Sequence, residues 1–205
     1  MFFMQLKKEY NMKRIMDFFF SALGLCLLLP LFLILSILIK STSKGPIFFM
    51  QERVGKDGVI FKMIKFRTMF SSQESSNPVS VKGDPRVTKL GVFLRKYKLD
   101  ELPELFNVLI GQMSLVGPRP DVPGYADKLV GVDRDILKLR PGITGPASLK
   151  YLHEEEILAK KDNPKLYNDE VIYPDKVQIN LDYYNNQSIW IDIKIIFATI
   201  FRKSY

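Results

Sequence analysis

Charged side chains gather around one short acidic stretch of the chain. Arg95, Lys96 and Lys98 come just before Asp100 and Glu101. Cations at this distance lower the pKa of a carboxylate, and they also bind phosphate groups. The spacing therefore predicts a site where a phosphate meets two ionised carboxylates.

The two carboxylates also have a purely structural interpretation. Asp100 and Glu101 stand where a helix is expected to begin, and Pro103 is acceptable in its first turn. The helix dipole and the free amides of a first turn stabilise acidic side chains there. A capping acid explains the carboxylates but leaves the three cations upstream unexplained, so both interpretations stay open.

Two loops each place an arginine among prolines and glycines. They are Gly117-Pro118-Arg119-Pro120 and Arg140-Pro141-Gly142-Ile143-Thr144-Gly145. Prolines restrict the backbone, so the guanidinium could be held toward a phosphate with little entropy left to lose. A rigid turn with a solvated arginine is the alternative. Neither loop is a Walker or dinucleotide fingerprint.

The elements that must position these residues are mostly helical. Residues 46–69 predict a β-hairpin turning at Lys56-Asp57-Gly58, and residues 71–85 predict a loop. Helices are predicted over 87–97 and from Asp100 to Gly111, which closes the second one. Further helices are predicted over 121–139, 153–161 and 190–201. The last is amphipathic, and it could lie on a bilayer or pack on the core.

An apolar segment near the N-terminus is long enough for a membrane. Phe18–Ile39 carries no charge over 22 residues, or about 33 Å of helix against a hydrocarbon core of about 30 Å. Pro30 predicts a kink near its middle. Four basic residues flank each side, so no direction of crossing is favoured; they are Lys7, Lys8, Lys13, Arg14, Lys40, Lys44, Arg53 and Lys56. A kinked span and a re-entrant helix stay equally open.

Composition limits the classes of partner and metal. The net charge is +8, and residues 1–119 hold 18 basic and 9 acidic side chains, which predicts an anionic partner for this part of the chain. Cys26 is the only cysteine and His153 the only histidine. A disulfide within the chain is therefore excluded, and a zinc site nearly so.

Taken together, four motifs resemble a known family. They are residues 65–69 (KFRTM), 99–109 (LDELPELFNVL), 111–120 (GQMSLVGPRP) and 140–145 (RPGITG). They are similar to the bacterial sugar transferases that initiate surface-glycan assembly, the monotopic phosphoglycosyl transferases. The resemblance runs in order from about Lys13 to the C-terminus, so chance is a poor explanation.

The resemblance implies a reaction and a set of site residues. A sugar 1-phosphate would pass from a UDP-sugar to undecaprenyl phosphate with release of UMP. Asp100 would be the nucleophile that forms a phosphosugar-aspartyl intermediate, and Glu101 would help hold Mg²⁺. The substrate-binding residues that it implies are Lys65, Arg67, Arg95, Arg119, Arg140 and Asp182.

The family also implies a fold and a location. The fold expected is α+β and predominantly helical, with a re-entrant helix kinked at Pro30 in residues 1–40 and one catalytic domain in residues 41–205. Interfacial amphipathic helices would surround that domain on the cytoplasmic face of the bacterial inner membrane. Partners would be the UDP-sugar, undecaprenyl phosphate, membrane lipid and downstream glycosyltransferases, with no nucleic acid.

One departure from the family limits what can be carried over. Many members continue with Trp-Ala-Gln-Val after Gly145, whereas this chain continues Pro146-Ala147-Ser148-Leu149. The resemblance therefore does not give the sugar. A different class of function, a membrane-anchored scaffold that binds anionic lipid and partner enzymes, explains the charge and the helix but leaves Asp100 and Glu101 without a role.

Overall fold

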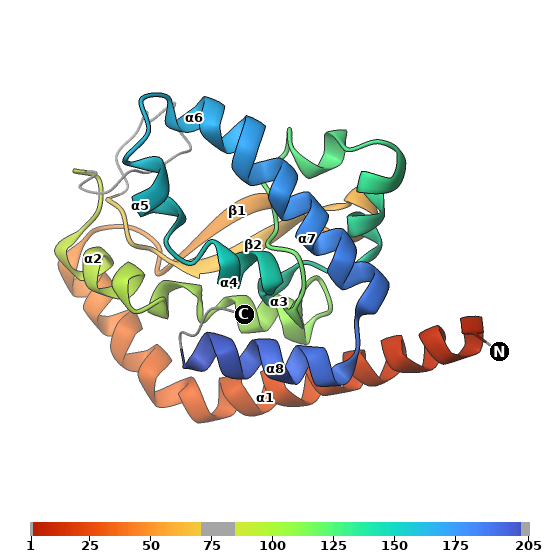
Figure 1. Cartoon of the computed structure of the whole chain (residues 1–205). Coiled ribbons are helices and arrows are strands. Elements are labelled where there is room, and N and C mark those ends of the chain that lie inside the picture. The colour runs from red at the N-terminus through yellow and green to blue at the C-terminus, as the bar shows by residue number, and fades with distance from the viewer. Residues whose placement is uncertain (1, 71–84, 202–205) are drawn as a thin grey trace.

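A single long helix, α1 (Phe2–Thr42), lies along one side of the rest of the chain (Figure 1). The computed structural model describes residues 2–70 and 85–201. The predicted loop over residues 71–85 lies outside the described residues except for Pro85. Within the described ranges the fold is predominantly helical with little sheet, as expected for the predicted α+β class.

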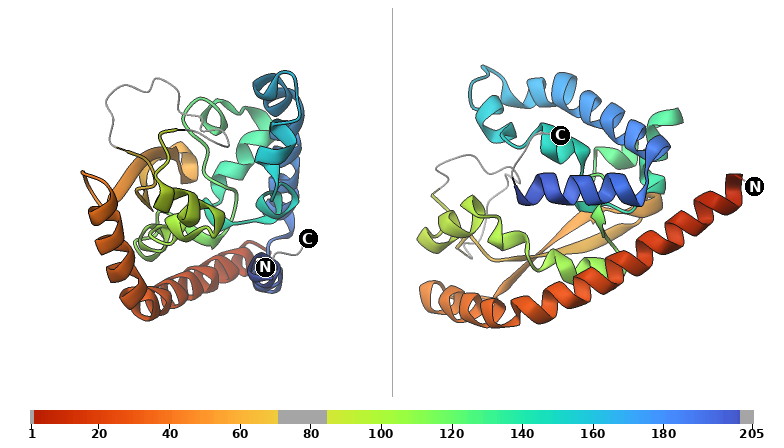
Figure 2. Two further views of the ribbon diagram at one scale, coloured as in Figure 1. Left: turned by 90° about the vertical axis from the view of Figure 1, so that its left-hand side faces the viewer. Right: turned by 60° about the horizontal axis from the view of Figure 1, so that its bottom comes forward.

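The inner and outer faces of α1 differ in burial. Phe32, Leu35 and Ile39 pack against Phe66 and Leu94 in one core cluster. Large apolar side chains remain exposed on the other faces: Ile15, Phe18, Phe19, Phe20, Leu23, Leu27, Leu29, Leu33, Ile34, Ile37 and Leu38. Residues 11–42 are long and apolar enough to cross a membrane by length and composition. The helix contains Pro30 and changes direction along its length (Figure 2).

The predicted hairpin is confirmed. Strands β1 (Phe48–Val54) and β2 (Ile60–Phe66) pair antiparallel, with Phe48 opposite Phe66 and Val54 opposite Ile60. The turn, η1 (Lys56–Gly58), has positive φ at Asp57 and Gly58, as a tight hairpin turn requires. Strand β2 ends at Phe66, which packs against α1. The residue before it, Lys65, belongs to the site described below.

The helices around Asp100 differ from the prediction at one point. Helix α2 (Lys89–Lys96) is confirmed, and Thr88 caps it by accepting a hydrogen bond from the Gly91 amide. Lys98 then adopts a left-handed conformation, and the chain forms a 3-10 turn, η2 (Leu99–Glu101), before α3 (Glu104–Leu109). Asp100 is therefore not the cap of an α-helix. Gly111, with φ +87°, ends α3 as predicted.

The two arginine-containing loops are held together by a short parallel sheet that the sequence did not predict. Strand β3 (Ser114–Val116) pairs with β4 (Gly142–Thr144). The Gly117 amide donates to the Thr144 carbonyl, and the Gly142 amide donates to the Pro118 carbonyl, each at 2.8 Å. The loop assignment of residues 142–144 was wrong because three-residue strands carry no measurable periodicity.

The helix predicted over residues 121–139 is confirmed only in part. The chain forms two 3-10 segments there, η3 (Ala126–Lys128) and η4 (Gly131–Lys138). Gly124 and Gly131 have φ values of +108° and +60°, which an α-helix does not accommodate.

The C-terminal part of the chain is helical. Its elements are α4 (Pro146–Lys150), α5 (Glu154–Leu158), α6 (Pro164–Tyr167), the π-turn η5 (Asn168–Ile172), α7 (Tyr173–Asn186) and α8 (Ile189–Ile200). Helix α5 confirms the predicted charged helix over a shorter range. Helix α8 confirms the amphipathic segment: Ile195 is fully buried against β3 and β4, while Trp190 is 76% exposed. Helix α7, which was not predicted, covers η4 (Figure 1).

Candidate active site

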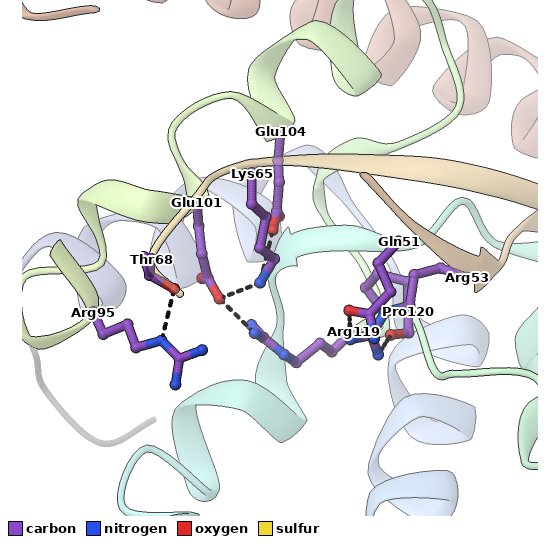
Figure 3. Close-up of polar contacts among 9 residues, drawn as sticks. All are labelled: Gln51, Arg53, Lys65, Thr68, Arg95, Glu101, Glu104, Arg119 and Pro120. Carbon is purple, nitrogen blue, oxygen red and sulfur yellow. Dashed lines mark hydrogen bonds and ion pairs between the residues drawn. The ribbon is translucent and has the colours of Figure 1, made fainter. Parts of the chain in front are cut away.

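Three segments that are distant in sequence meet at the carboxylate of Glu101. Lys65, near the end of β2, donates to Glu101 Oε1 from 2.8 Å, and Arg119, in the turn after β3, donates to the same oxygen from 2.6 Å (Figure 3). Burial disfavours the charged carboxylate, but the charges of Arg119 and Lys65 outweigh it and hold the pKa of Glu101 well below its usual value. Glu101 is therefore a fixed anion.

Asp100, next to this ion pair, has an acceptor without a donor. Its side chain is 8% exposed, and Oδ1 is buried with no hydrogen-bond partner in the described part of the chain. Burial and then the charge of Glu101 raise its pKa, whereas Lys65, Lys98 and Arg95 lower it. A buried carboxylate oxygen without a donor is costly. Such an unpartnered oxygen is typical of a side chain that reacts with a substrate or binds a ligand.

Glu104 is a third acid at the site that sequence reasoning missed. It is 2% exposed, and its Oε1 lies 3.3 Å from Lys65 Nζ. Burial and then the charge of Glu101 raise its pKa to about 7. The available signal was its spacing, because residues three apart on a helical turn face the same side.

Arg95 and Arg119 approach the site from two sides (Figure 3). Arg95 Nε donates to Thr68 Oγ1 at 3.0 Å, which fixes the base of its guanidinium. The Arg119 side chain is 45% exposed despite its ion pair, so part of its fork faces solvent. Phosphate oxygens that enter here would meet two guanidinium groups and Lys65.

Arg53 supports the Arg119 turn and was not predicted as a site residue. It donates to the Pro120 carbonyl at 3.1 Å and to Gln51 Oε1 at 2.6 Å. The turn is therefore held by a cation on β1 as well as by its own prolines. Nothing in the sequence motif marks Arg53, because the contact depends on how β1 packs.

Three of the predicted substrate-binding residues lie apart from this cluster. Arg67 donates to the Ser43 and Lys44 carbonyls and holds the end of α1. Arg140 donates to the Gly111 carbonyl at 2.8 Å and lines a small cavity with Lys13 and Asp17. Asp182 is exposed on α7. The cluster thus brings together Asp100, Glu101, Lys65, Arg95 and Arg119 from the predicted set.

The side chains at the site fit a Mg²⁺ ion only if the protein supplies one or two of its ligands and phosphates and water supply the others. Within residues 2–70 and 85–201, no group of three or more His, Cys, Asp or Glu side chains forms a closed cage. Mg²⁺ in phosphate-transfer sites commonly uses one or two carboxylates and takes its other ligands from phosphates and water. The adjacent carboxylates of Asp100 and Glu101, one with an unpartnered oxygen, match that chemistry.

Comparison with known proteins identifies the family. A family model described as bacterial sugar transferase matches residues 8–204. A UDP-glucose:undecaprenyl-phosphate glucose-1-phosphate transferase of Klebsiella pneumoniae is 39% identical over 195 residues, which cover 93% of this chain and 39% of that protein.

Two other relatives differ in name and in length. A putative undecaprenyl-phosphate N-acetylgalactosaminyl 1-phosphate transferase of Bacillus subtilis is 49% identical over 117 residues, 57% of this chain and 65% of that protein. The exopolysaccharide production protein PSS of Rhizobium leguminosarum is 36% identical over 197 residues, 92% of this chain and 93% of that protein.

The coverage sets how these matches are used. The chain spans about two fifths of the length of the first relatives it matches, although it spans nearly all of PSS. The family match, over residues 8–204, begins within α1 and extends through all four motifs. The chain belongs to the bacterial sugar transferase family.

Proposed function

We propose that the protein transfers a sugar 1-phosphate from a UDP-sugar to undecaprenyl phosphate, or a similar polyprenyl phosphate, and releases UMP. The observation that carries this proposal is the buried Asp100 oxygen without a donor, set beside Glu101, Lys65 and two arginines. The names of the relatives supply the substrate classes. The product would enter synthesis of a surface glycan by downstream glycosyltransferases.

The first step is an attack of Asp100 on the phosphorus that carries the sugar. A new bond forms between Asp100 and this phosphorus, and the bond to the bridging oxygen breaks, so that UMP leaves with that oxygen. The raised pKa of Asp100 makes its carboxylate more basic and hence more nucleophilic, while Lys65, Lys98 and Arg95 favour its ionised form.

The second step regenerates the carboxylate. An oxygen of the polyprenyl phosphate attacks the same phosphorus, and the bond to Asp100 breaks. An acyl phosphate keeps the transferred group activated between the two steps. Arg119, Arg95 and Lys65 would screen the negative charges of the attacking and leaving phosphates, which otherwise repel each other.

Glu101 would hold the Mg²⁺ that the family implies. When bound, the ion would add positive charge at the phosphates. Lys65 and Arg119 pair with one oxygen of Glu101, Oε1, and this fixes the orientation of the carboxylate.

The re-entrant geometry of α1 has support from both ends of the helix. Near its start, Arg14 donates to carbonyls at the end of α3. Just past its other end, the Ser43 and Lys44 carbonyls accept from Arg67. Both ends therefore contact the same domain, and a helix that crossed the bilayer could not satisfy both. We infer that residues 1–40 anchor a catalytic domain, residues 41–205, on the cytoplasmic face of the inner membrane.

Trapping of the intermediate tests the chemistry. The full-length protein in nanodiscs of lipid free of polyprenyl phosphate would be given Mg²⁺ and a UDP-sugar labelled in the phosphate next to the sugar. We expect label on the protein and release of UMP in the wild type and in Asp135→Asn. Asp100→Asn should show neither the label nor UMP. UMP release by Asp100→Asn at the normal rate would contradict the nucleophile, and an inactive wild type would favour the scaffold.

The sugar needs a separate experiment. Relatives of this chain are named for glucose and for N-acetylgalactosamine, so family membership leaves the sugar open. A panel of UDP-sugars scored by UMP release would identify it.

The membrane geometry is tested separately. Tags at residues 1 and 205 should both resist protease added to the periplasmic side.

A further inference from the structure

The three charged residues of α1 that directly precede its apolar part have partners inside the catalytic domain. Lys13, Arg14 and Asp17 lie within one and a half turns, where the apolar part of the helix begins. Asp17 is 2% exposed. A carboxylate buried at this place is costly unless it is paired, and anchoring α1 in a membrane does not require one.

Arg14 fixes the far end of the helix that follows the two catalytic acids. Its guanidinium donates to the Val108 carbonyl at 2.6 Å and to the Leu109 carbonyl at 2.7 Å. These are carbonyls at the C-terminal end of α3, which a cation stabilises by hydrogen bonding and through the helix dipole. Because α3 begins with Glu104, Arg14 sets the position of the segment that carries Asp100 and Glu101.

Asp17 fixes the strand that leads to Arg119. Its Oδ1 accepts a hydrogen bond from the Leu115 amide at 3.0 Å. Leu115 is the middle residue of β3, and Arg119 follows four residues later in a turn tied to β4 by two hydrogen bonds. A displacement of Leu115 would therefore move the turn as a unit and shift the Arg119 guanidinium by a similar distance.

Lys13 secures this part of α1 from the other side. Its ammonium pairs with Asp192 on α8 and donates to the Tyr183 hydroxyl on α7, while that hydroxyl donates to Asp192. Asp192 is 1% exposed. The ring of contacts holds α1, α7 and α8 in one arrangement from which Arg14 and Asp17 reach the catalytic segments.

We infer that Arg14 and Asp17 are positioning residues, which set the segment carrying Asp100 and Glu101 in register with the turn carrying Arg119. The membrane helix is then part of the catalytic framework as well as an anchor. The inference rests on the proposed function for its effect on catalysis, but its structural content does not. A shift of about 1 Å at a reacting group can cost about 100-fold in rate.

Two variants with matched controls test the inference in the full-length protein in nanodiscs. Asp17→Ala, which removes the acceptor, is compared with Asp127→Ala, because Asp127 also accepts one backbone amide, that of Gly124 at 2.6 Å. Arg14→Met is compared with Arg134→Met, because Arg134 also donates to two carbonyls but is exposed. Arg14→Lys keeps the charge and should recover part of the rate.

The kinetic readout is UMP release at saturating and limiting UDP-sugar. We expect kcat to fall at least about 10-fold in Asp17→Ala and Arg14→Met, with KM changed far less, and both controls to resemble the wild type. In an Arg119→Ala background the Asp17→Ala change should cost little more, since it acts through Arg119. Unchanged kcat in both variants, or effects that multiply in full with Arg119→Ala, would overturn the inference.

Amide hydrogen exchange gives a readout that needs no activity. In Asp17→Ala, exchange should become faster at residues 115–119, whereas Asp127→Ala should affect only the region around Gly124. Unchanged exchange over residues 115–119 would refute the positioning role of Asp17. A wild type that released no UMP would contradict the proposed function instead, and the exchange result would still decide this inference.

Discussion

Arg119 Nη2 lies 2.6 Å from Glu101 Oε1, and this ion pair joins the turn after β3 to the segment that carries Asp100. Lys65 Nζ shares the same oxygen at 2.8 Å. Glu101 is thus held between a cation from β2 and a cation from the turn after β3, and the Asp100 carboxylate beside it has no comparable partner. The ion pair makes Glu101 a fixed anion, and under the proposed function Asp100 is the acid that reacts.

Arg119→Lys should lower kcat/KM for the UDP-sugar by about 10- to 100-fold. Lysine keeps the charge but cannot donate from two nitrogens in a plane, so it cannot hold Glu101 and a phosphate together. Steady-state UMP release measures the effect, with Arg134→Lys as the control because Arg134 is exposed and away from the site. A wild-type rate in Arg119→Lys would show that charge alone is sufficient.

Glu104→Gln should stabilise the protein increasingly as the pH rises. Burial and the charge of Glu101 raise the pKa of Glu104 from 4.5 to about 7. The folded wild type therefore binds this proton more tightly than the unfolded chain does. Its stability falls as the pH rises from 4.5 to 7, by up to about 3 kcal/mol, and the Gln variant avoids this loss.

Denaturation of both proteins between pH 4.5 and 8 checks this prediction. The difference in free energy of unfolding between Glu104→Gln and wild type should grow over this range and level off above pH 7. Glu170→Gln, at an exposed position, is the control and should show no such trend. A constant difference at all pH values would mean that Glu104 keeps its ordinary pKa.

Lys65→Met should reduce UMP release by about 100-fold, whereas Lys62→Met on the same strand should not. Lys65 contacts both Glu101 and Glu104, so its loss leaves two buried carboxylates facing each other beside Asp100. Lys62 is exposed. Equal rates in the two variants would place Lys65 outside the catalytic machinery.

The sequence was most informative where neighbouring residues act together. Asp100 and Glu101 are adjacent, and Arg95 and Lys98 lie a few residues before them, so composition and spacing predicted a phosphate site. The cations that pair with Glu101, which are Lys65 and Arg119, come from distant segments and could not be predicted in this way. Glu104 was not predicted as a site residue because an acidic side chain is common in the first turn of a helix. The family resemblance placed Arg67 at the site with Lys65, but β2 ends at Phe66 and the chain then turns toward α1.

Long-range pairing could not be predicted from local patterns. Lys13 and Asp192 are 179 residues apart, and neither has a neighbour that marks it as paired. The pairing of β3 with β4 could not be predicted either, because each strand has three residues and the pairing depends on the close approach of Gly117 to Gly142. From the sequence, the cations that flank the apolar helix bear only on its orientation in the membrane, yet Lys13, Arg14 and Arg53 bind groups within the protein.

Gly117→Ala should disrupt the site through the backbone alone. A Cβ on Gly117 would lie 2.3 Å from the Arg140 carbonyl oxygen and 3.0 Å from the Gly142 nitrogen. Both are backbone atoms of the neighbouring segment, so β3 and β4 must move apart and carry Arg119, two residues on, away from Glu101. We expect a loss of about 1–3 kcal/mol in the free energy of unfolding, and a fall in kcat of about 100-fold.

The matched control for Gly117→Ala is Gly24→Ala in α1. There a Cβ would meet only the Leu105 side chain, at 3.4 Å, which is an ordinary contact. Thermal unfolding and UMP release should be near wild type in Gly24→Ala and reduced together in Gly117→Ala. If Gly117→Ala kept both the wild-type melting temperature and the wild-type kcat, the two strands would not be held as closely as the pairing of β3 with β4 requires. Arg119 would then owe its position to Glu101, to the contact of Arg53 with Pro120 and to its flanking prolines.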